Sequence, residues 1–454
     1  ARGLLRLLQA LTSHAPHAME DLRDLGEKSV MTWVKRGGFA LVVLLVLAFA
    51  VLASWEPLMM ASAARAPGTR TYRAEIIRDE WGVPHITGKT DADTAYGVAI
   101  AHAEDDFFTL QDVVAMSRGR YGAIAGEDGA KVDYVYHLID ARGTAEREYP
   151  KLPADTRALF EAYAAGLNQY AQEHPAEVKL ANLFPVTGMD VAAGFALRQP
   201  FFFGLDGVIS PLVAGEDLRR EHGPDIPGFP RPPLGDPAAA PATAPKQART
   251  LVLPLGEDAE HLGSNAFAVA PKKGGGVTTL VSNSHQPLRG GVAWYELVVE
   301  SGEGWHFAGA NFPGSPFPFL GHNEHLGWTN TVNTPDMIDV YQLELDETGN
   351  RYKLDGEWRD LESEWVTLPV RMGPVVLPIR RQVLRSVHGP VIRNAKGAFA
   401  VRYGGIGQLQ QLDAYYRLNK AKTFAEWEGQ LSRLAIPSTN FIYADESGTI
   451  GYFY

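Results

Sequence analysis

The dipeptide Gly263-Ser264 stands where a serine could act as a nucleophile on its own backbone. It follows a proline- and alanine-rich run, residues 223–247, and directly precedes a β-type run, AFAVA. Attack of the Ser264 hydroxyl on the Gly263 carbonyl would move the acyl group from nitrogen to oxygen, and water would cleave the ester. Glycine keeps that carbonyl accessible and tolerates strained backbone angles. The alternative interpretation is a plain turn before a strand, because the dipeptide alone is common.

Cleavage at this position would leave Ser264 with a free α-amine beside its hydroxyl. The reference pKa of an α-amine is about 7.7–8.0, so the amine could act as the general base near neutral pH. The chain contains no cysteine, which removes thiol nucleophiles, disulfides and thiolate zinc sites. Serine is therefore the remaining nucleophile for an N-terminal hydrolase at this junction.

The elements that must position this serine differ on the two sides of the spacer. The sequence divides into an N-terminal extension with a signal or anchor, a mostly helical segment, a spacer and a β-rich segment, at residues 1–66, 67–222, 223–263 and 264–454. Residues 72–86 predict two short strands, and apolar spacing predicts helices over 90–116 and 153–173. Short β-type runs separated by turns follow Gly263. Together these segments predict an α+β fold joined through an exposed, flexible spacer.

Composition excludes several classes of protein. The chain has 454 residues, with 42 basic and 53 acidic side chains and a formal net charge of −11. This balance argues against broad binding to nucleic acid, which needs a basic surface. Hydrophobic residues make up 45% and charged residues 21% of the chain, which is typical of globular proteins and excludes a wholly disordered or coiled-coil chain.

An apolar run near the N-terminus has the features of a secretion signal. Lys35-Arg36 precede FALVVLLVLAFAVLA, residues 39–53, and small residues follow in ASAARA, residues 61–66. A membrane-spanning helix needs roughly 20 apolar residues, so a cleaved signal is favoured over a retained anchor through 39–53 or a buried core helix. We therefore expect a periplasmic or secreted protein, with membrane anchoring as the alternative.

The last residues predict a hairpin that ends in its returning strand. Asp445-Glu446-Ser447-Gly448 is typical of a turn between two strands, and the chain stops at GTIGYFY. We expect the β-rich segment to be truncated after Tyr454. A truncation there would leave the proposed site residues present but without some of their supporting strands, so this chain by itself could be inactive.

Nine motifs, in order, resemble the penicillin acylase family of N-terminal serine hydrolases, from about Tyr72 to the last residue. The matching pieces are RDEWGVPHI, DADTAYGVAIAHAEDD, GSNAFAVA, VSNSHQP, WYE, FPGSP, LGHNEHLGWTNTVNTPDMIDVY, HGP and STNFIYAD. The family includes penicillin, cephalosporin and acyl-homoserine-lactone acylases. The resemblance implies an α/β heterodimer cut from one precursor and an Ntn-hydrolase αββα sandwich, in which two stacked sheets lie between helical layers.

The resemblance also implies roles for four residues in acyl transfer. Ser264 matches the nucleophile and new N-terminus, and His285 in SNSHQP matches a residue near it that orients or tunes the α-amine. Asn440 matches the side-chain donor to the oxyanion, and Val332 matches the residue that supplies a backbone N–H. Outside the family context, a structural histidine is the alternative for His285, and a turn or strand-end residue is the more common role for an asparagine such as Asn440.

Further positions match the family's acyl pocket. Leu320 matches a pocket-lining position, and Phe201, Phe202 and Phe203 lie where the helical chain contributes aromatic residues, with Phe202 the one we select. Plain core packing is the alternative for each.

TPDMIDVY resembles the calcium loop of penicillin G acylase. In it, Asp336 and Asp339 would supply carboxylates and Ile338 a carbonyl oxygen. The chemistry itself requires no cofactor, and a carboxylate-rich turn without an ion is the alternative.

Two functional hypotheses follow. The first is an exported, self-processing amidohydrolase that cleaves the N-acyl amide bond of acyl-homoserine lactones, β-lactam side chains or acyl peptides. Histidine at 285 and the TVNT run look closer to the lactone acylases, which favours aliphatic acyl chains. The second is a non-catalytic, membrane-tethered binding protein on the same scaffold.

Overall fold

The computed structural model describes residues 36–60, 71–216, 263–333 and 335–454. The chain divides into two compact units, Ala1–Glu56 and Pro57–Tyr454. The proposed spacer lies almost wholly outside the described residues, as does most of the N-terminal extension, so the four proposed segment boundaries remain predictions.

One helix, Arg36–Met59, contains the apolar run near the N-terminus. It has 24 residues and none of its apolar window is buried. The helix is longer than the run over 39–53 because it continues through Met59, and roughly 20 residues suffice to cross a membrane. Its length and composition therefore fit a span, although a signal sequence passes the same test. Length no longer favours a signal over an anchor, and both remain predictions.

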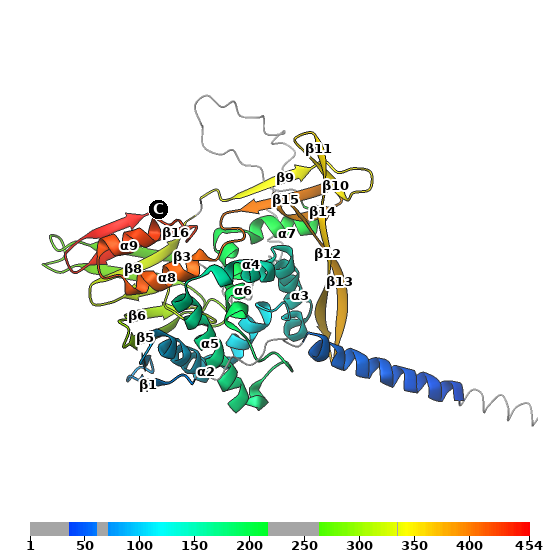
Figure 1. Cartoon of the computed structure of the whole chain (residues 1–454), viewed down its shortest axis with the longest axis horizontal. Coiled ribbons are helices and arrows are strands. Elements are labelled where there is room, and N and C mark those ends of the chain that lie inside the picture. The colour runs from blue at the N-terminus through cyan, green and yellow to red at the C-terminus, as the bar shows by residue number, and fades with distance from the viewer. Residues whose placement is uncertain (1–35, 61–70, 217–262, 334) are drawn as a thin grey trace, which may run out of the picture. The chain divides into compact units, whose positions relative to one another are not determined.

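The main sheet of the larger unit combines strands from both sides of the spacer (Figure 1). Its strand order is β1-β2-β5-β6-β7-β8-β16-β17, and only β2 and β5 pair in parallel. The bounds are β1 Ala74–Arg78, β2 Pro84–Gly88, β5 Tyr295–Ser301, β6 His306–Asn311, β7 Leu320–His322, β8 Leu326–Val332, β16 Thr439–Asp445 and β17 Ile450–Phe453. The two strands predicted over 72–86 and the predicted C-terminal hairpin are confirmed.

Helices dominate the chain from Asp91 to Ala214. They are α2 Asp91–Met116, α3 Gly122–Leu138, α4 Ala141–Glu148, α5 Ala154–Glu173, α6 Gly188–Arg198 and α7 Asp206–Ala214, with short 3₁₀ turns at Tyr149–Lys151, Pro175–Glu177 and Gln199–Phe203. Thr90 begins α2 with a capping box to Asp93. Helices α2 and α5 pack closely, because a Cβ on Gly166 would lie 2.7 Å from the Ala99 side chain. The predictions for α2 and α5 are confirmed.

Beyond Gly263 the chain is mainly β-structure, as predicted. β3 (Gly263–Val269) and β4 (Thr279–His285) form a two-stranded sheet, and β12, β13, β14, β15 and β9 form a five-stranded one. The remaining bounds are β9 Ile338–Leu343, β10 Arg351–Leu354, β11 Glu357–Asp360, β12 Glu362–Met372, β13 Val375–Ser386, β14 Gly389–Asn394 and β15 Gly397–Tyr403. Two helices, α8 (Gln410–Lys420) and α9 (Phe424–Leu431), were not predicted. The mixture of helices and sheets matches the predicted α+β class.

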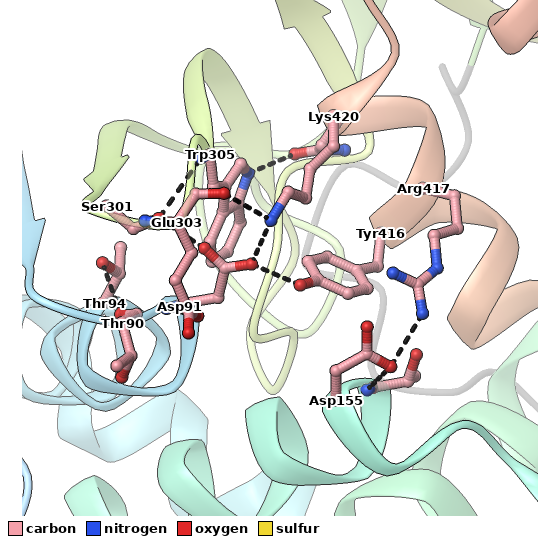
Figure 2. Close-up of polar contacts among 12 residues, drawn as sticks. Thr90, Asp91, Thr94, Asp155, Ser301, Glu303, Trp305, Tyr416, Arg417 and Lys420 are labelled. Carbon is pink, nitrogen blue, oxygen red and sulfur yellow. Dashed lines mark hydrogen bonds and ion pairs between the residues drawn. The ribbon is translucent and has the colours of Figure 1, made fainter.

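A buried carboxylate, Asp91, connects the helical part to the β-rich part (Figure 2). It accepts hydrogen bonds from the hydroxyls of Ser301 and Tyr416, and its Oδ2 lies 2.5 Å from Nζ of Lys420. The Asp91 N–H donates to Oε2 of Glu303 at 2.9 Å. Only 3% of Asp91 is exposed, so the carboxylate of this ion pair lies out of water. The first turn of α2 is thereby held against the end of β5 and the end of α8.

Asp91→Ala is expected to lower the free energy of unfolding by about 3–5 kcal/mol, because it leaves the Lys420 cation without its buried partner. Urea unfolding of the Ser264→Ala chain, in which a single polypeptide unfolds, measures the change. Asp128→Asn is the matched control, since Asp128 pairs with Lys131 on the surface and such pairs contribute about 0–1 kcal/mol. Equal effects of the two substitutions would contradict the importance of the buried cluster.

Candidate active site

Ser264 is the second residue of β3, and its hydroxyl contacts the carbonyl that it would attack. The Ser264 Oγ donates a hydrogen bond to the Gly263 carbonyl oxygen at 2.6 Å. β3 pairs with β4 in antiparallel register, which places Gly263 opposite His285 and Ser264 opposite Ser284. A Cβ on Gly263 would lie 3.0 Å from Nδ1 of His285. The imidazole therefore lies next to Gly263, and a larger residue there would require the ring of His285 to shift.

Val332 and Asn440 meet at the ends of β8 and β16. The antiparallel register pairs Val332 with Thr439 and Asn440 with Thr331. The Asn440 Nδ2 donates to Oγ1 of Thr331 at 2.9 Å, and the Asn440 Oδ1 accepts from the Tyr452 hydroxyl at 2.9 Å. These two contacts fix the orientation of the amide in the structure.

The β3–β4 pair packs against β8, which brings Ser264 to the same region as Val332 and Asn440. The hydroxyls of Ser282, on β4, and Thr329, on β8, are 2.6 Å apart and join the two sheets. The four residues to which the resemblance assigns catalytic roles thus come from neighbouring strands. Their roles are a separate question from their placement and remain predictions.

A cavity of about 120 Å³ opens beside Ser264. Ser264, Thr331 and Val332 line it, and six aromatic residues form a large part of its walls. The aromatic residues are Phe195, Phe202, Trp294, Phe312, Phe319 and Tyr415. The rings of Trp294 and Phe312 stack with their centroids 3.9 Å apart, and Phe202 stacks on Phe312 at 5.7 Å. The arrangement suits an apolar group held next to a nucleophile.

Some of the positions selected from the sequence line this cavity and others do not. Phe202 lines it, whereas Leu320, His285 and Asn440 are not among its lining residues. Phe319, the residue before Leu320, lines it instead, because successive side chains of an extended segment point to opposite sides. The pocket role of Leu320 therefore stays a prediction that this cavity does not support.

Sequence reasoning did not find Arg198 and Gln411, two of the polar residues of the cavity wall. Burial lowers the pKa of Arg198 to about 10, so its guanidinium is still charged at neutral pH. Burial also raises the pKa of the Tyr415 phenol. The FPGSPFPF stretch, which supplies Phe312 and Phe319, was a usable signal for the aromatic wall.

The segment proposed for calcium does not assemble a metal site in the described residues. Asp336 and Asp339 are both exposed, and Ile338 begins the edge strand β9. The described part of the chain contains no group of three or more His, Asp or Glu side chains arranged to hold an ion. Calcium takes six to eight oxygen ligands, and two exposed carboxylates beside one strand do not form such a shell. We therefore derive no chemistry from a calcium ion.

Comparison with known proteins places the chain in a defined group. The family model described as penicillin amidase matches residues 73–454. An acyl-homoserine lactone acylase PvdQ from Pseudomonas putida is 28% identical over 411 residues, covering 85% of this chain and 51% of that protein. An acyl-homoserine lactone acylase QuiP from Pseudomonas aeruginosa is 25% identical over 416 residues, covering 82% and 48%.

A solved structure of a thermostable penicillin G acylase from Alcaligenes faecalis is 30% identical and covers 35% of this chain and 29% of its own, with a TM-score of 0.32. This chain spans about half the length of the curated relatives that it matches. Because the penicillin amidase model matches most of the sequence, the chain belongs to the penicillin amidase family, and the predicted family and Ntn-hydrolase fold class are confirmed.

Proposed function

We propose that the protein is a self-cleaving amidohydrolase that hydrolyses the N-acyl bond of small molecules through Ser264. The observation that carries the proposal is that the Ser264 hydroxyl lies next to both the preceding carbonyl and a cavity. The Ser264 Oγ contacts the Gly263 carbonyl oxygen at 2.6 Å and Ser264 lines an aromatic cavity. The same atom can therefore attack its own backbone first and the acyl carbonyl of a substrate afterwards. Two relatives named as acyl-homoserine lactone acylases support this class of reaction.

The reaction would proceed in two acyl-transfer steps. Ser264 attacks the substrate carbonyl while its own α-amine accepts the hydroxyl proton, and the amine product leaves with a proton returned from that group. Water then attacks the ester on Ser264 with the same amine as base. His285, which packs on Gly263, would orient the α-amine after cleavage.

Asn440 and Val332 would stabilise the oxyanion in both steps. The Asn440 Oδ1 is occupied by the Tyr452 hydroxyl, so the amide nitrogen faces Thr331, which lines the cavity. An amide nitrogen has two N–H donors, and Thr331 takes only one of them. The second would serve the oxyanion together with the backbone N–H of Val332.

The mature form would be an α/β heterodimer from one precursor, and the helix Arg36–Met59 would direct its export as a cleaved signal or hold it at a membrane as an anchor.

N-acyl-homoserine lactones, penicillin G and acyl peptides form the first substrate panel. Release of the free amine, followed for the wild-type protein and for Ser264→Ala, tests the class. Absence of any Ser264-dependent release would contradict the proposal.

Self-cleavage is expected to generate a fragment that begins Ser264-Asn265. Ser264→Ala should abolish the cut because it removes the attacking oxygen, whereas the surface substitution Ser432→Ala should leave it unchanged. A denaturing gel with N-terminal sequencing of the larger fragment provides the measurement. A wild-type chain that stays as uncut as Ser264→Ala would instead favour the non-catalytic, membrane-tethered binding protein.

Gly263→Val is expected to slow the cut by up to about a hundredfold, because relief of the contact with His285 would shift the Gly263 carbonyl relative to the Ser264 hydroxyl, and a misplacement of roughly 1 Å can cost about 10²-fold in rate. The added side chain would meet Nδ1 of His285, which lies 3.0 Å from the Cβ position. Gly263→Ala should have a smaller effect because it adds only that Cβ. The time course of precursor loss after synthesis measures all three chains, and equal rates would show that the contact is irrelevant.

Asn440→Ala is expected to lower kcat by about 10²–10³ with little change in KM, because an oxyanion donor acts mainly in the transition state. Steady-state hydrolysis by the processed protein gives both constants. Asn350→Ala, at an exposed turn before β10, is the control and should match the wild type. A rise in KM at constant kcat would assign Asn440 to substrate binding instead.

A further inference from the structure

Ser438, the residue before β16, has a backbone conformation that is rare for any residue except glycine. Its φ is 57° and only 7% of its surface is exposed. The other non-glycine residues with a positive φ in the described structure are exposed or half-buried: Asp140, Asn182, Asp355 and Leu434. A left-handed conformation costs free energy and persists where the surroundings impose it, and such residues cluster at functional sites. The question is therefore what imposes it on Ser438.

One buried hydrogen bond accompanies this conformation. The Ser438 Oγ donates to the carbonyl oxygen of Asn333 at 3.0 Å, and Asn333 is also only 7% exposed. Asn333 directly follows Val332, the last residue of β8. The antiparallel register of β8 and β16 pairs Val332 with Thr439, so the Ser438 contact lies one residue beyond the last pair of the ladder. It ties the start of β16 to the end of β8.

Both expected oxyanion donors lie at this tied end. Val332 precedes Asn333, and Asn440 follows Ser438 by two residues. The Val332 side chain is 48% exposed, so side-chain packing constrains this residue little. Chain segments with few buried contacts open most readily. The bond from Ser438 to Asn333 restricts the backbone on the far side of Val332, and with it the direction of the Val332 N–H.

Ser438 reaches these donors without lining the cavity beside Ser264. Its neighbours Pro437 and Thr439 line the cavity, whereas Ser438 is not among the lining residues. Its hydroxyl is bonded to Asn333 instead. The Oδ1 of Asn333 makes no hydrogen bond in the described structure, so Ser438 holds Asn333 by its backbone and not by that side-chain oxygen. Any effect of Ser438 on the reaction would therefore pass through other residues.

We propose that Ser438 is a positioning residue for acyl transfer, which holds the Val332 N–H and the Asn440 amide at a fixed separation. Its left-handed backbone sets the direction in which β16 begins, and its hydroxyl ties that turn to the end of β8. The inference rests on the proposed function of Ser264 and adds a residue to which the family resemblance assigns no role. Oxyanion donors act on charge that develops in the transition state, so loss of the tie slows the reaction more than it weakens substrate binding.

Ser438→Gly isolates the hydroxyl, because glycine adopts a positive φ without strain. With a compound that the wild type hydrolyses, kcat is expected to fall about 10- to 100-fold, since a misplacement of roughly 1 Å can cost about 10²-fold. KM should stay within about twofold. Ser438→Ala, which loses the hydroxyl and keeps the strain, should fall at least as far. Ser432→Ala, an exposed serine after α9, is the control and should match the wild type.

A boronic acid reports on the oxyanion donors directly. The Ser264 Oγ adds to the boron of pentylboronic acid, the hydroxyl proton passes to the α-amine, and the resulting anionic, tetrahedral boronate resembles the intermediate of acyl transfer. Hexan-1-ol has a similar length and forms no such bond. Ser438→Gly is expected to raise the inhibition constant of the boronic acid about tenfold or more and that of hexan-1-ol less than about twofold. Equal changes for the two inhibitors would overturn the inference.

Hydrogen exchange tests the tie without turnover. In the Ser264→Ala protein, the amides of residues 326–333 should exchange about tenfold faster once Ser438→Gly is added, whereas Ser432→Ala should leave them unchanged. Thermal unfolding of each variant separates this local effect from a loss of fold. Exchange that does not change in Ser438→Gly would overturn the inference even if no substrate were found.

The kinetic and exchange results together separate this inference from the proposed function. Ser264-dependent hydrolysis with a wild-type kcat in Ser438→Gly would leave the proposed function standing and reject the role of Ser438. Faster exchange in Ser438→Gly without Ser264-dependent hydrolysis in any protein would reject the proposed function, and with it the positioning role, while the tie itself would stand.

Discussion

The Asp91 carboxylate is the contact on which the arrangement of the larger unit most depends. It accepts from a hydroxyl at the end of β5, from a phenol on α8 and from the Lys420 ammonium. Its own position at the start of α2 adds the favourable field of a helix N-terminus. The donors lie on the opposite side of the spacer from Asp91. This buried charge, like that of Asp413, therefore joins two stretches of chain that the proposed cleavage would make separate polypeptides.

β8 is the strand on which the arrangement of the candidate site most depends. It pairs with β16, which supplies Asn440, and β3 and β4 pack on it, which brings Ser264 and His285 into place. The register of β8 and β16 sets Asn440 beside the Val332 backbone, and the packing of the β3–β4 sheet on β8 brings the Ser264 hydroxyl to the same region. Aromatic residues line the cavity beside them, together with a few buried polar groups. Apolar walls with a small number of placed polar groups are typical of small-molecule sites.

Sequence patterns predicted the elements whose signals are local. α2 and α5 have helical apolar spacing, and the Thr90 capping box strengthens the first of them. α3 was missed because Gly126 and Gly129 interrupt its pattern, and Gly126 indeed takes a positive φ of 68°. α8 was missed because its exposed face is strongly polar, although Leu412, Tyr415 and Tyr416 are spaced for one buried face.

Candidate site residues could be selected from the sequence where the order of motifs identifies them. Residues that enter the site only through tertiary packing could not. Motif order located Ser264, His285 and Asn440 on adjoining strands. It selected Leu320, whereas Phe319 lines the cavity, because one residue of register selects the side chain that faces the cavity. Nor could it identify Arg198, since an arginine at a helix C-terminus is usually solvated and only the packing of α6 against the Pro313 turn buries it.

The parallel pairing of β2 with β5 has a consequence for how the β-rich segment can exist in solution. β5 has β2 on one side and β6 on the other, and β2 comes from the stretch before α2. Without that stretch, β5 becomes a terminal strand with a row of unsatisfied amides and carbonyls beside the buried residues Leu297 and Val299. Such edges recruit strands from other molecules. The pairing with β2 thus covers an edge of β5 that the β-rich segment alone would leave open.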